Sequence, residues 1–101
     1  MHTLHDLKIL EEYFEAKLKG VKPFELRLDD RGFNVGDRLR LREIRPIQGS
    51  EPLMHEYTGR VLITEVLYIL RGVKGLQDGY IIMGERPEDY LECDFPEEAT
   101  V

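Results

Sequence analysis

The sequence contains no tryptophan, a single cysteine and no long apolar run. Because Cys93 is the only cysteine, neither a disulfide framework nor a cysteine-based zinc site can form within one chain. No apolar stretch approaches the roughly 20 residues that a membrane-spanning helix needs. Residues 1–6 also lack the basic and then apolar regions of a signal peptide. We therefore expect a protein that makes no membrane contact and is cytoplasmic, or lies in the host cytoplasm if a phage encodes it.

The 101 residues are enough for one domain with one core, since domains most often have about 100–150 residues. Hydrophobic residues make up 42% of the chain, which is typical of a globular protein and not of a disordered one.

The net charge of −6 is concentrated at the C-terminal end. Residues 84–101 contain seven acids and one base, and the other 83 residues contain 13 acids and 13 bases. We therefore expect a neutral domain over residues 1–83, followed by a flexible acidic tail over residues 84–101. A neutral body is compatible with a nucleic-acid partner without requiring one.

Hydrophobic periodicity predicts one helix and five strands. The helix is expected over residues 11–19, with its acids early, its lysines late and Gly20 at its end. Strands are expected over residues 3–10, 24–28, 38–42, 60–70 and 80–83.

The residue patterns of three of these strands predict which of their faces are buried. Residues 24–28 alternate between a Phe and Leu face and a face with Glu25 and Arg27, which is the pattern of a half-buried strand. In residues 38–42 two leucines should point inward and three arginines outward. Residues 60–70 are apolar on both faces, so this strand should be central. The expected class is α+β but mostly β: a small, partly closed barrel with one N-terminal helix.

Several short motifs occur in a characteristic order. After Gly20, the segment from Lys22 to Arg27 has the pattern Lys-x-x-Glu-x-Arg, and a Val-Gly-Asp turn follows at residues 35–37. The later motifs are Tyr-Thr-Gly-Arg at residues 57–60, an apolar run at 66–70 and Gly-Tyr-Ile-Ile at 79–82. Over residues 3–83 the chain resembles ASCH domains of the PUA-like class. In particular it is similar to a branch of short phage and bacterial proteins described as a domain of unknown function.

This resemblance implies a PUA-like β-barrel, similar to domains that bind RNA, with a cleft lined by the Lys-x-x-Glu-x-Arg strand. One bacterial ASCH branch consists of small amidohydrolases that act on acetylated cytidine through a Lys, a Thr and a Glu. Lys22 matches that lysine, but Glu25 stands at the threonine position. The distal glutamate has no clear counterpart here.

Lys22, Glu25 and Arg27 are the first candidate binding group. In a cleft, Lys22 and Arg27 would bind a phosphate or a base carbonyl, and Glu25 would accept a hydrogen bond from a base amine. If the protein is an enzyme, a desolvated Lys22 could act as base or nucleophile. The alternative is a charged outer strand face on which Glu25 and Arg27 simply pair.

Arg38, Arg40 and Arg42 form the second candidate group, a basic ladder on one strand. Such a ladder can follow a phosphate backbone. The alternative is a solvated outer face that neighbouring acids neutralise.

The sequence suggests no cofactor and no metal, because His2, His5 and His55 are too scattered for a metal motif. We expect a module that binds RNA or a nucleotide-like ligand. Two alternatives stay open. One is a small amidohydrolase or nuclease that acts on a modified nucleoside or RNA. The other is a phage-encoded module that targets a host protein.

Overall fold

A computed structural model describes residues 2–92 of the chain, so Cys93 and the second half of the expected acidic tail lie outside the described residues. The elements follow in the order β1 (Leu4–Leu10), α1 (Glu11–Leu18), β2 (Phe24–Leu28), β3 (Arg38–Pro46), β4 (His55–Leu70) and β5 (Tyr80–Glu92). The mostly β architecture with one short helix is confirmed, and each predicted element is present.

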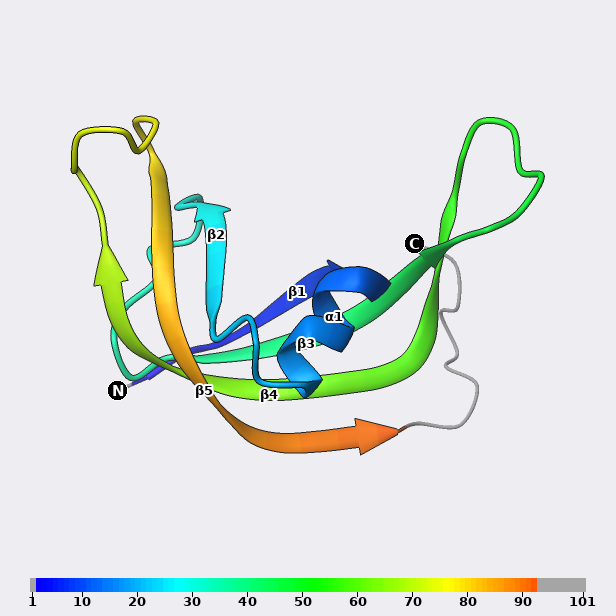
Figure 1. Ribbon diagram of the computed structural model, residues 1–101, viewed down its shortest axis with the longest axis horizontal. Coiled ribbons are helices and arrows are strands. Elements are labelled where there is room, and N and C mark those ends of the chain that lie inside the picture. Colours follow the sequence, from blue (N-terminus) through cyan, green and yellow to red (C-terminus); the bar gives the residue numbers. More distant parts are fainter. Residues whose placement is uncertain (1, 93–101) are drawn as a thin grey trace.

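The five strands form one sheet in the order β1-β3-β4-β5-β2. β1 pairs with β3 in parallel, and the other three pairs are antiparallel. Figure 1 shows that the long strands β4 and β5 bend, so that the sheet curls into a half-barrel with α1 in its hollow. The pairing of β4 with β5 shifts register near Thr64 and near Leu67, and such bulges increase local bending.

The core lies between α1 and the inner face of this curled sheet. Phe14 of α1 is fully buried, as are Leu39 and Leu41 of β3, which confirms the predicted inward face of β3. β4 lies in the middle of the sheet, as its two apolar faces predict. Within residues 2–92, no helix is long and apolar enough to cross a membrane.

The turn before β3 is organised by a buried carboxylate, that of Asp37. It accepts hydrogen bonds from the backbone N–H groups of Thr3 (3.0 Å) and Asn34 (2.9 Å), and it lies 2.8 Å from His5 Nε2. Burial alone would raise the pKa of Asp37. The bonds from Thr3, His5 and Asn34 outweigh burial and hold this pKa below its usual value.

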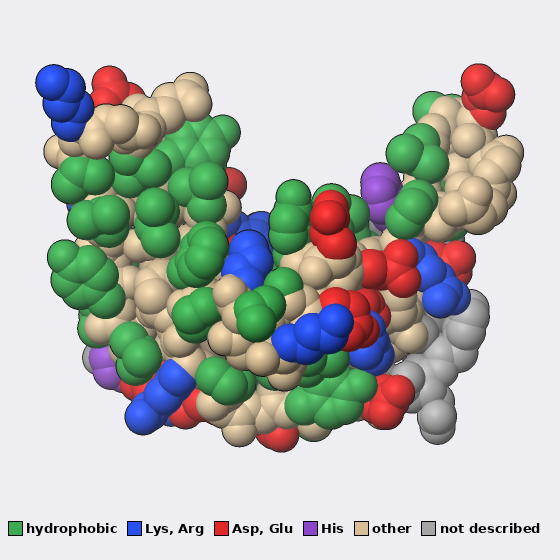
Figure 2. Space-filling view, in the orientation of Figure 1, with side chains coloured by type: hydrophobic (Ala, Val, Ile, Leu, Met, Phe, Trp, Pro, Cys, Tyr) green, Lys and Arg blue, Asp and Glu red, His purple; other side chains and the backbone are tan. Residues whose placement is uncertain are grey.

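The orientation of β2 differs from the one that its pattern suggests. The apolar side chains Leu26 and Leu28 are 55% and 48% exposed, whereas Glu25 is only 4% exposed. Figure 2 shows hydrophobic side chains gathered over the raised end of the sheet that contains β2, the end of β4 and the start of β5. The charged face of β2 therefore points into the half-barrel, because buried partners for it come from α1 and β5.

β5 is longer than the strand predicted over residues 80–83. The strand continues to Glu92, so residues 84–92, where we expected the acidic tail to begin, are part of the sheet. Two acids of this segment have basic partners: Glu85 binds Lys17, and Glu88 binds Arg38 of β3. These pairs explain why an acidic segment can belong to the sheet.

The half-barrel is closed at its seam by side chains and not by a strand ladder. β1 and β2 are the two edges of the sheet. Arg27 Nη2 donates to the carbonyl oxygen of Lys8 at 2.7 Å, and Arg31 Nη1 donates to that of Asp6 at 2.8 Å. The two arginines thus join the region of β2 to the free edge of β1.

Candidate ligand cleft

A cavity of about 400 Å³ lies at the seam between β1 and β2. Its walls come from β1, from Tyr13 of α1, from Lys22, and from β2. The nine lining residues are Lys8, Ile9, Leu10, Tyr13, Lys22, Phe24, Glu25, Leu26 and Arg27. The three residues of the Lys-x-x-Glu-x-Arg motif therefore line one cavity.

Lys22 lies beside two aromatic rings of this cavity. Its Nζ atom is 5.2 Å from the ring centroid of Tyr13 and 5.0 Å from that of Phe24. The same atom donates to the carbonyl oxygen of Phe24 at 3.2 Å and lies 3.9 Å from Glu25 Oε1. Burial lowers the pKa of Lys22, although the nearby Glu25 carboxylate opposes this shift.

Glu25 and Arg27 form an ion pair inside the cleft. Arg27 Nε donates to Glu25 Oε2 at 2.9 Å, while Arg27 Nη2 holds the edge of β1. The pairing that we considered for an outer strand face is present, but it lies on the inner face. Lys22, Glu25 and Arg27 thus place two cations and one carboxylate against a partly aromatic wall.

A second layer of buried charge supports the cleft from below. Lys17 Nζ lies 3.1 Å from Glu25 Oε1, donates to the carbonyl oxygen of Phe24 at 2.7 Å and binds Glu85. Thr64 Oγ1 donates to Glu85 Oε2 at 2.8 Å. Burial raises the pKa of Glu85, and Lys17 opposes that shift. Lys17 therefore fixes both the backbone and the carboxylate of the strand that lines the cleft.

Sequence reasoning missed this buried layer. One signal was available: Lys17 lies three residues after Phe14 and so shares the inward face of α1. Glu85 gave no comparable signal, because it was assigned to the tail.

Glu25 Oε1 is the one buried side-chain polar atom in the described part of the chain without a hydrogen bond. Its 3.1 Å contact with Lys17 is an ion pair whose orientation does not make a hydrogen bond. Glu25 is thus held by charge from Lys17 on one oxygen and by a hydrogen bond from Arg27 on the other.

Residues 4–85 match the family described as "Domain of unknown function (DUF3850)". The chain belongs to this family. The matched segment contains every residue that lines the cleft, and it also includes Lys17 and Glu85. No protein of curated function matches the sequence.

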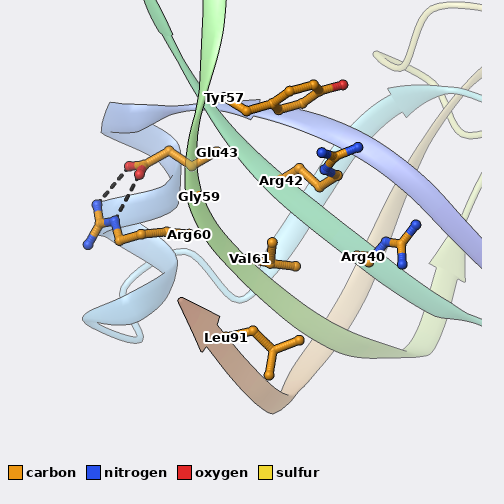
Figure 3. A pocket seen from close by; sticks show the side chains of 8 residues that line it. All are labelled: Arg40, Arg42, Glu43, Tyr57, Gly59, Arg60, Val61 and Leu91. Atoms are coloured by element: carbon orange, nitrogen blue, oxygen red, sulfur yellow. Dashed lines mark hydrogen bonds and ion pairs between the residues drawn. The ribbon is translucent and has the colours of Figure 1, made fainter. Parts of the chain in front are cut away.

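The basic ladder of this DUF3850 domain is divided among several partners. Arg38 binds the carboxylate of Glu88 at 2.5 and 3.1 Å, and Arg40 binds that of Asp6 at 3.1 and 2.6 Å. Arg42 is stacked on a tyrosine ring. None of the three lines the cleft, but Arg40 and Arg42 line a separate pocket, shown in Figure 3.

Within residues 2–92, no three His, Cys, Asp or Glu side chains lie close enough together to hold a metal ion. The charged and aromatic residues that line the cleft are Lys8, Lys22, Arg27, Glu25, Tyr13 and Phe24.

Proposed function

We propose that this domain is of the PUA-like ASCH type and binds RNA or a nucleotide-like ligand in the cleft around Lys22, Glu25 and Arg27. One observation carries the proposal: a single cavity combines two partly exposed aromatic rings with two cations and a buried carboxylate. Tyr13 is 45% exposed and Phe24 is 41% exposed, so both rings are open to a ligand. The cytoplasmic location predicted from the sequence suits such a ligand.

Each group has a distinct task in this proposal. A base stacks on Tyr13 or Phe24, as bases of single-stranded RNA commonly do on aromatic side chains. Lys22 donates to a phosphate oxygen or base carbonyl. Glu25, which Lys17 and Arg27 hold in place, faces an amine of the base. The cavity of about 400 Å³ is within the size range of small-ligand sites.

The first test is an amide NMR titration of the labelled protein with a short single-stranded RNA, at low and then moderate salt. We expect shifts clustered from Tyr13 to Arg27 that fade as salt rises. Lys22→Ala should weaken binding by about 1–3 kcal/mol, while Lys19→Ala removes an equal charge outside the cleft and should change little.

Absence of shifts at both salt concentrations, with the fold intact, would exclude RNA binding for that class of oligomer. The host-protein partner predicted from the sequence would then be the next ligand to test.

The lowered pKa of Lys22 favours a second candidate, an amidohydrolase that acts on an acylated nucleoside. A neutral Lys22 would take a proton from water as the water attacks the acyl carbon. The C–N bond would then break, and the proton would pass to the departing amine. Incubation with acetylated cytidine should release acetate, and Lys22→Ala should abolish this release without unfolding the protein. If the intact protein releases no acetate, the amidohydrolase candidate is excluded and only the binding proposal remains.

A further inference from the structure

Arg42 differs from every other arginine of the chain. The remaining eight each lie within 3.8 Å of a carboxylate oxygen. These pairs are Arg27–Glu25, Arg31–Asp30, Arg38–Glu88, Arg40–Asp6, Arg45–Glu56, Arg60–Glu43, Arg71–Asp29 and Arg86–Glu65. Arg42 makes no ion pair with any described residue, although the chain has 20 acids and 14 bases. Among residues 2–92, Arg42 is thus the arginine without a carboxylate partner.

The guanidinium of Arg42 is held in position by an aromatic ring. Its central carbon lies 3.8 Å from the ring centroid of Tyr57, on the neighbouring strand β4. Figure 3 shows the two side chains next to each other at the pocket, with Glu43 and Arg60 paired on the side toward the helix. Stacking occupies one face of the guanidinium but leaves its N–H edges open for a planar acceptor.

The surroundings of Arg42 are positive. Lys8 of β1 is the direct partner of Arg42 in the strand register, so both side chains lie on the same face of the sheet. Like Arg42, Lys8 has no ion pair with a described residue. Arg40 lies on this face as well, and it binds the carboxylate of Asp6, whose pKa Arg40 and, more weakly, Arg42 lower. The pocket beside them has a volume of about 270 Å³, and its lining also includes the paired Glu43 and Arg60 as well as Gly59, Val61 and Leu91.

We infer that Arg42 and Lys8 bind a phosphate group, with Tyr57 fixing the guanidinium; this rests on the proposed function, because it names where the phosphate of the ligand lies. An arginine fork binds two oxygens of one phosphate, and a lysine adds a compact charge. Lys8 connects the two sites, because its carbonyl oxygen is held by Arg27 at the cleft while its side chain belongs to the Arg42 face. A nucleotide chain with a base in the cleft therefore crosses β1 and places an adjacent phosphate between Lys8 and Arg42.

The test uses NMR of the full chain with three probes: inorganic phosphate, adenosine monophosphate and a short single-stranded RNA. Acetate serves as a carboxylate control at the same ionic strength. We expect all three phosphate-containing probes to shift the signals of Arg42 and Tyr57, and we expect acetate to leave them in place. Inorganic phosphate should leave the stacking residues Tyr13 and Phe24 in place, whereas the nucleotide and the RNA should also shift these two cleft signals.

Variants quantify the contribution of Arg42. Arg42→Ala should weaken RNA binding roughly tenfold at low salt and reduce the slope of log affinity against log salt by about one. Arg42→Lys keeps the charge but loses the fork and the planar stack, so it should restore the slope and only part of the affinity. Arg45→Ala is the matched control, because Arg45 lies on the same strand but is already paired with Glu56, at 3.8 Å.

The outcomes separate this inference from the proposed function. If RNA shifts the cleft signals while Arg42 and Tyr57 stay still and Arg42→Ala leaves the salt slope unchanged, the phosphate site is refuted and the cleft stands. If phosphate and adenosine monophosphate shift Arg42 and Tyr57 but no probe shifts the cleft, the phosphate site stands and the proposed function is refuted. Equal shifts with acetate and phosphate would overturn the choice of phosphate.

Discussion

β2 and β3 both alternate apolar with charged residues, but β3 turns its apolar residues toward the core, whereas β2 turns its charged residues inward. In β3 the leucines at 39 and 41 are fully buried and the arginines point away from the core. In β2 the leucines at 26 and 28 face solvent, and Glu25 is buried. Alternation thus identifies a strand and its two faces, but it does not determine which face is buried.

The neighbours of each strand decide the outcome. β3 lies between β1 and β4, where apolar side chains fill the space under α1. β2 is an edge strand, and its inward positions meet Lys17 from α1 and Glu85 from β5. A buried charge is tolerated only when it is paired, so these two residues permit the reversed orientation.

The largest expected effect comes from removing the residue that neutralises the inward face of β2. Lys17→Met keeps the apolar stem but leaves Glu25 and Glu85 buried without their shared cation. The free energy of unfolding should fall by about 3–5 kcal/mol. Urea unfolding measures this change, and Lys19→Met, an exposed lysine two residues later, is the control. An equal loss in both variants would show that the buried cluster is not what orients β2.

A smaller effect should distinguish the leucines of the two strands. Leu41→Ala opens a cavity in the core and should cost about 2–5 kcal/mol. Leu26→Ala removes an exposed side chain and should change the stability by less than about 1 kcal/mol. Thermal or urea unfolding of the two variants gives the comparison directly. Similar losses would mean that the leucine face of β2 is buried in solution.

The carboxylates beside the two strands should respond to pH in opposite directions. The folded pKa of Asp37, just before β3, lies below its unfolded value of about 3.9, so its stabilisation is present above that pH and is lost as the pH falls through the folded pKa. The folded pKa of Glu85 is raised, so its contribution is greatest at low pH and declines as the pH rises through that pKa.

Asp37→Asn should therefore destabilise the protein by about 1–3 kcal/mol at pH 7, because an NH2 group replaces one of the two oxygens that accept from Thr3, Asn34 and His5. The difference from the natural sequence should shrink as the pH falls below about 4. Urea unfolding from pH 3 to 7 measures it. A difference that stays constant over this range would contradict the lowered pKa of Asp37.

The sequence allowed the elements of the fold to be predicted because each depends on local periodicity. The central place of β4 also followed from its two apolar faces. The length of β5 and the orientation of β2 could not be predicted in the same way. They depend on the pairing of Lys17 with Glu85, which are 68 residues apart in the sequence.

The candidate site also has a part that the sequence predicts and a part that it does not. Lys22, Glu25 and Arg27 are close in sequence and on one strand or its approach, so their shared cavity was a reasonable expectation. The sequence did not predict that Arg42 would lack a carboxylate partner among the described residues. This depends on which carboxylate each of the other arginines binds. That distribution is a property of the whole folded chain.

The seam between β1 and β2 also affects how the protein meets other copies of itself. An edge strand with open carbonyl and N–H groups is a template on which a strand of another molecule can pair. On β1, the outward carbonyls of Asp6 and Lys8 are already occupied by the guanidinium groups of Arg31 and Arg27. A competing strand would have to displace both arginines before it could add to the sheet. Resistance to fibrous aggregation and the shape of the cleft thus depend on the same residue, Arg27.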